Sequence, residues 1–190
     1  LELITRAFVR PGQGVIVSQH SFAVYTLVAK SVGANLRVVP AIRWGHDLDG
    51  MAEAVDSETR IVFIANPNNP TGTWVSRDSL IDFLDSIPHH VLVVLDEAYF
   101  EYVEEQNYPD GIQLLSRFPR LIVTRTFSKI HGLAGLRVGY SVSSNEIAEI
   151  LNRVRQPFNV NVLGNVAALT ALKDEEFVAE SRTLNREQMR

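Results

Sequence analysis

Short apolar runs alternate along this chain with amphipathic segments, and this alternation restricts the possible folds more than any other feature. The runs are rich in valine and isoleucine and mostly lack a polar–apolar repeat, which is typical of strands buried on both faces of a sheet. We expect strands at Gly14–Ser18, Leu36–Val39, Ile61–Ala65, Val91–Asp96, Leu121–Thr126 and Arg137–Val142. We expect helices at Phe22–Val32, Leu48–Ala54, Ser76–Ser86, Ile112–Phe118 and Asn145–Val154.

This order of strands and helices predicts an α/β fold with three layers, α/β/α, around a mainly parallel central sheet. The stretch Gly132–Gly139 is too short for a crossover helix, so the strand that follows it should be antiparallel and the sheet mixed. Ser76 and Ser144 stand where helix N-caps are expected. From about Gln156 onward the pattern becomes helical.

The length of 190 residues suits one domain with a sizeable core. The chain opens at Leu1 without a methionine, inside one helical pattern, and stops at Arg190 inside another. We therefore expect residues 1–190 to be an incomplete domain of a larger protein, with the residues after about 156 leading toward a second, C-terminal domain.

Composition removes several classes of function. Eighteen basic residues against 22 acidic residues give a net charge of −4, and the sequence has no basic run, which argues against a nucleic-acid surface. No apolar stretch approaches the ~20 residues that a bilayer requires. The absence of cysteine excludes disulfides, thiolate nucleophiles and zinc–thiolate sites, and the five histidines lack metal-ligand spacing.

Polar motifs follow three successive expected strands, at Asn66–Gly72, Asp96–Tyr99 and Thr126–Lys129. Taken singly, each has an ordinary explanation: an Asn-Pro turn, an acidic helix cap and a surface Ser-Lys pair. In open α/β sheets, however, ligands bind outside the carboxyl ends of the strands. If the three strands are neighbours, the motifs converge on one crevice, which favours a binding site.

Lys129 has the most distinctive position, because it ends an apolar run and Arg137 follows eight residues later. A lysine at a strand end can form a Schiff base with an aldehyde, and pyridoxal phosphate supplies an aldehyde, an electron-accepting ring and a phosphate. That cofactor needs an acid for its ring nitrogen, partners for its ring oxygen, a cation with small donors for its phosphate, and an aromatic face. The candidates, in that order, are Asp96; Tyr99 and Asn69; Arg137, Thr126 and Ser128; and Phe22.

The motifs together resemble the large domain of fold-type I, pyridoxal-phosphate-dependent aminotransferases. Asn66–Gly72, Asp96–Tyr99 and Ser128-Lys129, with Arg137 eight residues on, follow the order and spacing of that family. The resemblance implies catalytic roles for Lys129, Asp96 and Tyr99. In it, Lys129 carries the cofactor and later moves a proton, Asp96 faces the pyridinium, Tyr99 and Asn69 bind the ring oxygen, and Arg137 binds the phosphate.

Within the superfamily, the resemblance is strongest to histidinol-phosphate aminotransferases, through Asp96–Glu101, Leu133–Tyr140 and Arg155–Asn161. It implies amino transfer to 2-oxoglutarate in histidine biosynthesis by a cytoplasmic homodimer. Phe22 stands where many relatives have tyrosine, which keeps the stacking face but loses a hydroxyl. Residues that bind the substrate are expected outside the chain, so the chain alone should be inactive.

Three alternatives stay open on the sequence alone. The scaffold could serve an aminotransferase for aromatic or other amino acids, or a phosphothreonine decarboxylase. It could also be the cofactor-binding sensor domain of a transcription regulator, because one fold supports several functions.

Overall fold

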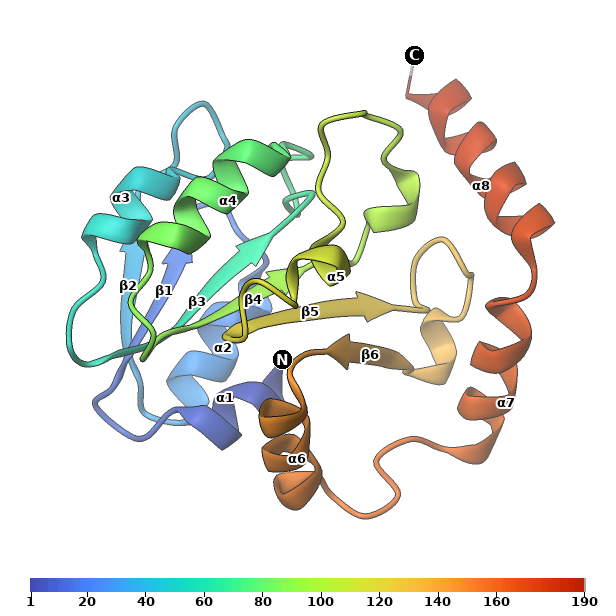
Figure 1. Cartoon of the computed structure of the whole chain (residues 1–190). Coiled ribbons are helices and arrows are strands. Elements are labelled where there is room, and N and C mark those ends of the chain that lie inside the picture. The colour runs from blue at the N-terminus through green and yellow to red at the C-terminus, as the bar shows by residue number, and fades with distance from the viewer. Residues whose placement is uncertain (190) are drawn as a thin grey trace.

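Five parallel strands and one antiparallel strand form the central sheet, in the order β2-β1-β3-β4-β5-β6. A computed structural model describes residues 1–189 (Figure 1). The strands are β1 (Gly14–Ser18), β2 (Asn35–Val39), β3 (Thr59–Ala65), β4 (Leu92–Asp96), β5 (Leu121–Thr126) and β6 (Gly139–Val142). The helices are α1 (Glu2–Phe8), α2 (Ala23–Ser31), α3 (Leu48–Glu53), α4 (Arg77–Ser86), η1 (Phe100–Tyr102), α5 (Gly111–Leu114), η2 (Ala134–Leu136), α6 (Asn145–Val154), α7 (Val162–Ala171) and α8 (Glu175–Gln188).

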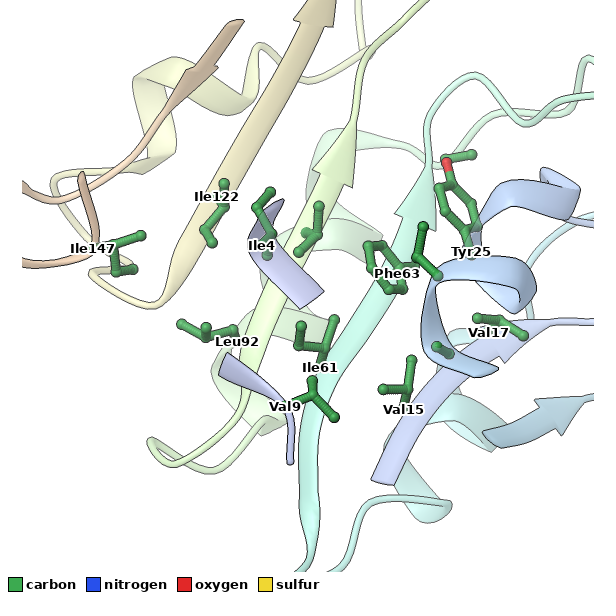
Figure 2. Close-up of a cluster of buried hydrophobic side chains, with 14 of the residues drawn as sticks. Ile4, Val9, Val15, Val17, Tyr25, Ile61, Phe63, Leu92, Ile122 and Ile147 are labelled. Carbon is green, nitrogen blue, oxygen red and sulfur yellow. The ribbon is translucent and has the colours of Figure 1, made fainter. Parts of the chain in front are cut away.

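Helices cover both faces of this sheet. Successive strand residues point to opposite sides, and both sides carry apolar side chains that must be buried. On one face, Val15 and Phe63 belong to an apolar cluster that includes residues of α1, α2 and α6 (Figure 2). On the other face, Ile16 and Val62 belong to a cluster with residues of α3, α4 and α5. The predicted three-layer α/β/α fold with a mainly parallel sheet is confirmed, as is the antiparallel strand after Gly132–Gly139.

Two of the elements expected from the sequence are shorter in the structure. The last strand begins at Gly139, because Arg137 adopts a left-handed backbone (φ 58°) at the end of η2 and cannot continue into a strand there. The helix expected at Ile112–Phe118 ends at Leu114. Residues 115–117 form a turn instead, and Pro119 disfavours helical conformation at Phe118, the last residue of the expected helix.

The segment after residue 156 is helical, as expected, and forms α7 and α8. Helix α8 lies beside η1, where Arg182 Nε donates a hydrogen bond of 2.6 Å to the carbonyl of Glu101. Ser76 caps α4 through a hydrogen bond from the Ser79 amide, whereas Ser144 precedes α6 without a side-chain cap bond. Within residues 1–189, no helix combines the length and apolar character that crossing a membrane requires.

Strand β6 is an edge strand of the sheet and, among the residues described, pairs with β5 only. Gly139, Tyr140 and Ser141 are exposed, in contrast to the fully buried strands β1 and β4. The outer edge of β6 therefore presents backbone groups to the surroundings.

Gly111, the first residue of α5, is packed so closely that it admits no side chain. A Cβ atom there would lie 2.6 Å from Leu95 Cδ2, 2.8 Å from Glu97 Oε1 and 2.9 Å from Val123 Cγ2. We predict that Gly111→Ala lowers the free energy of unfolding by about 1–3 kcal/mol through overpacking, measured by urea denaturation. Gly135→Ala is the control: its methyl group meets open space, and a change beyond about 0.5 kcal/mol there, or none at Gly111, would contradict the explanation.

Candidate active site

The carboxyl ends of β3, β4 and β5 lie side by side, as expected from the three polar motifs. Ala65 is in register with Asp96, and Asp96 with Thr124. The backbone continues this pairing beyond the strands, since the Asn66 amide donates to the Asp96 carbonyl at 2.9 Å. The three motifs therefore begin at the same edge of the sheet.

A cavity of about 590 Å³ opens at this edge. It is lined by most of the residues that the sequence singled out, namely Phe22, Asp96, Thr126, Ser128, Lys129 and Arg137. Asn69 and Tyr99 lie beside it: Asn69 Nδ2 donates to the Tyr99 hydroxyl at 3.3 Å, and Lys129 Nζ lies 5.0 Å from the centre of the Tyr99 ring. The structure thus gathers all eight candidates around one space.

Asp96 is buried, with 9% of its surface exposed. Burial raises the pKa of its carboxyl group, and a hydrogen bond of 2.8 Å from the Tyr25 hydroxyl to Oδ2 opposes this effect by favouring the carboxylate. A buried acid that lines a cavity suits a cationic group.

The turn after β5 gathers a cation and hydroxyl groups. Arg137 Nη1 donates to the carbonyl of Ala134 at 2.7 Å and to Ser128 Oγ at 3.4 Å. Thr126 Oγ1 accepts a bond from the Ser128 amide at 3.1 Å and donates to the carbonyl of Val138 at 3.3 Å. Arginine and small donors in this arrangement suit an anion such as phosphate. A positive φ at a non-glycine residue is also typical of functional sites.

A buried ion pair behind the cavity was missed by the sequence reasoning. Glu97 is fully buried, and its Oε2 accepts bonds of 2.9 and 2.7 Å from Arg125 Nε and Nη2. The Gly111 amide donates to Glu97 Oε1 at 2.8 Å, and Arg125 Nη2 also reaches Asp110 Oδ1 at 2.7 Å. The Arg125 guanidinium lies 3.6 Å from the centre of the Phe100 ring. This network ties the segment that carries Tyr99 to β5, which leads to Lys129.

Tyr25 was missed as well. Its place in an amphipathic segment indicates a buried side chain, but nothing in the sequence pairs it with Asp96, which lies 71 residues away. The interpretation of Asp96-Glu97 as a helix cap is not realised, because Tyr99 occupies the N-cap position of η1. Both acids instead face inward.

The whole chain matches a known family, whose description is "Aminotransferase class I and II", over residues 1–190. The histidinol-phosphate aminotransferase 2 of Pseudomonas fluorescens (strain Pf0-1) is 58% identical over 185 residues, which cover 97% of this chain and 50% of that protein. The protein of the same name from Pseudomonas aeruginosa is 56% identical over 97% of the chain. The chain spans about half the length of these relatives.

The fold of this chain also matches that of a solved structure. The crystal structure of histidinol-phosphate aminotransferase from Sinorhizobium meliloti, in complex with pyridoxal 5′-phosphate, superposes with a TM-score of 0.91 at 33% identity. The superposition covers 96% of this chain and 50% of that one.

The Glu97 network predicts a specific dependence of stability on pH. Burial outweighs the neighbouring Arg125 and raises the pKa of Glu97 from 4.5 to about 7. The folded state thus keeps this proton to higher pH than the unfolded state, so the contribution to stability is complete below pH 4.5 and is lost as the pH rises through about 7.

We predict that Glu97→Gln removes this decline, whose slope is at most ~1.4 kcal/mol per pH unit. The measurement is the free energy of unfolding in urea between pH 4.5 and 8 for both proteins. Glu105→Gln, at an exposed glutamate, serves as the control and should leave the wild-type profile intact. Parallel profiles for Glu97→Gln and the wild type would show that Glu97 has an ordinary pKa.

Proposed function

Because the chain belongs to the class I and class II aminotransferase family, we propose that it is the cofactor-binding large domain of a pyridoxal-phosphate-dependent histidinol-phosphate aminotransferase. The observation that carries this proposal is the convergence of Lys129, Asp96 and Arg137 on one cavity. Identity of 58% to a histidinol-phosphate aminotransferase supports the substrate. The residues after about 156 lead toward a second domain. The protein transfers the amino group of histidinol phosphate to 2-oxoglutarate in histidine biosynthesis, in the cytoplasm.

The residues of the cavity fit the cofactor. The buried Asp96 carboxyl suits a protonated ring nitrogen, and the Phe22 ring suits stacking on the pyridine. Arg137 with Ser128 and Thr126 suits the phosphate, while Tyr99 and Asn69 offer a hydroxyl and an amide for the ring oxygen. When bound, pyridoxal phosphate supplies an aldehyde for amines and a ring that accepts electrons from the reacting carbon.

Lys129 is the proton carrier in this proposal. Its neutral Nζ would take a proton from the substrate carbon and deliver the same proton to the carbon of the cofactor. The Tyr99 ring lies against Nζ and, with Asn69 holding its hydroxyl, limits where the amine can go. Asp96 would face the protonated ring nitrogen of the bound cofactor, and Arg137 would hold its phosphate.

We also expect a homodimer. Helix α7 carries apolar side chains that are more than half exposed, at Val162, Leu163, Val166 and Leu169. A contiguous apolar surface of this kind usually marks an interaction site, and a second subunit is the partner that the family suggests.

Lys129 can be tested directly, because the sequence contains only two other lysines, Lys30 and Lys173. We predict that borohydride treatment of the chain with pyridoxal phosphate attaches the reduced cofactor to the peptide that contains Lys129. Lys129→Ala should lose this adduct while still binding cofactor noncovalently, and Lys30→Ala and Lys173→Ala should keep it. Peptide mass spectrometry makes the measurement; an adduct that persists in Lys129→Ala would refute the assignment.

The substrate can be tested in a chimera in which this chain replaces the matching 185 residues of the Pseudomonas fluorescens relative. We predict amino transfer from histidinol phosphate to 2-oxoglutarate, with kcat/KM at least about tenfold above that for phenylalanine. Lys129→Ala in the same chimera and the unaltered relative are the controls. Preference for phenylalanine, or release of carbon dioxide from phosphothreonine, would favour the other enzyme classes; cofactor binding without turnover would favour the sensor domain.

A further inference from the structure

Tyr25 lies wholly inside the core, yet its hydroxyl contacts Asp96, which lines the cavity. Its side chain is 0% exposed, and its ring stacks on Phe63 with 4.8 Å between ring centres and 3° between planes (Figure 2). The hydroxyl donates to Asp96 Oδ2 at 2.8 Å. Tyr25 also meets Phe22 edge to face at 5.8 Å. One buried side chain therefore contacts both the acid at the cavity floor and the aromatic residue at its wall.

Packing accounts for the ring of Tyr25 but not for its oxygen atom. A phenylalanine would give the same stack on Phe63, and a buried hydroxyl destabilises a core unless it finds a partner. The partner here is a carboxylate oxygen, to which a hydrogen bond is stronger than to a neutral acceptor. The hydroxyl is thus explained by Asp96.

The consequence for Asp96 is both electrostatic and geometric. Burial favours the neutral carboxyl group, whereas a cationic ring nitrogen requires the carboxylate. A donor on Oδ2 stabilises the carboxylate and restricts its rotation.

We propose that Tyr25 is a positioning residue of this site, whose O–H keeps Asp96 ionised and oriented toward the ring nitrogen of the cofactor. The inference rests on the proposed function, because it acts through a pyridoxal phosphate that Asp96 binds. It assigns to α2 a part in cofactor binding that the three strand-end motifs do not contain.

The test compares two ligands in the 190-residue chain: pyridoxal 5′-phosphate and its 1-deaza analogue, in which carbon replaces the ring nitrogen. Tyr25→Phe should raise the dissociation constant for pyridoxal phosphate about ten- to hundredfold, the range expected for a lost hydrogen bond to a charged group. It should change the dissociation constant of the analogue by no more than about twofold, since the analogue has no ring nitrogen for Asp96 to bind. Spectral titration measures both constants, and urea denaturation verifies that the variant is folded.

Two controls separate positioning from packing. Tyr108→Phe removes another largely buried tyrosine hydroxyl, which donates to the Asn66 carbonyl, and should change neither constant. In an Asp96→Asn background, Tyr25→Phe should have no further effect on pyridoxal phosphate. Equal weakening of both ligands by Tyr25→Phe, or no weakening of either, would overturn the inference while leaving the proposed function intact. Failure of the wild-type chain to bind either ligand would overturn both.

Discussion

The hydrogen-bonded register of β3, β4 and β5 is the constraint on which the site depends. These strands pair in parallel, with Ala65, Asp96 and Thr124 level with one another. Parallel pairing places every carboxyl end at the same edge, so segments separated by some thirty residues of sequence reach a common space. A shift of one residue in β4 would reverse the faces to which Asp96 and Glu97 point.

The same two-residue repeat that divides the core also divides two neighbouring acids. Asp96 turns toward Tyr25, on the side of the sheet covered by α2, whereas Glu97 turns toward Gly111, on the side covered by α5. The first acid faces the cavity and the second anchors Arg125. Adjacent residues of the same chemistry thereby meet different surroundings, because successive side chains of an extended chain point to opposite faces.

Sequence reasoning located the strands, the order of the motifs and the cavity residues, since these depend on local patterns: apolar runs, turn residues and strand ends. The roles of the eight cavity residues toward a cofactor stay predictions. Tyr25 and Arg125 were not predicted from the sequence, because their significance comes from partners far away along the chain, Asp96 and Glu97. Arg137 shows a second limit: the start of β6 follows from one left-handed residue, which an apolar pattern does not encode.

The open side of β6 has a consequence for how the sheet moves. Amides on that side lack a strand partner among the described residues, and three of the four β6 residues are exposed. Local opening favours segments with few buried contacts, so amide hydrogen exchange should be faster in the exposed strand β6 than in the fully buried strand β4. Through its pairing with β5, this fraying edge lies next to the turn that carries Lys129. Lys129 thus follows a strand whose two neighbours differ, since β4 is fully buried and β6 is mostly exposed.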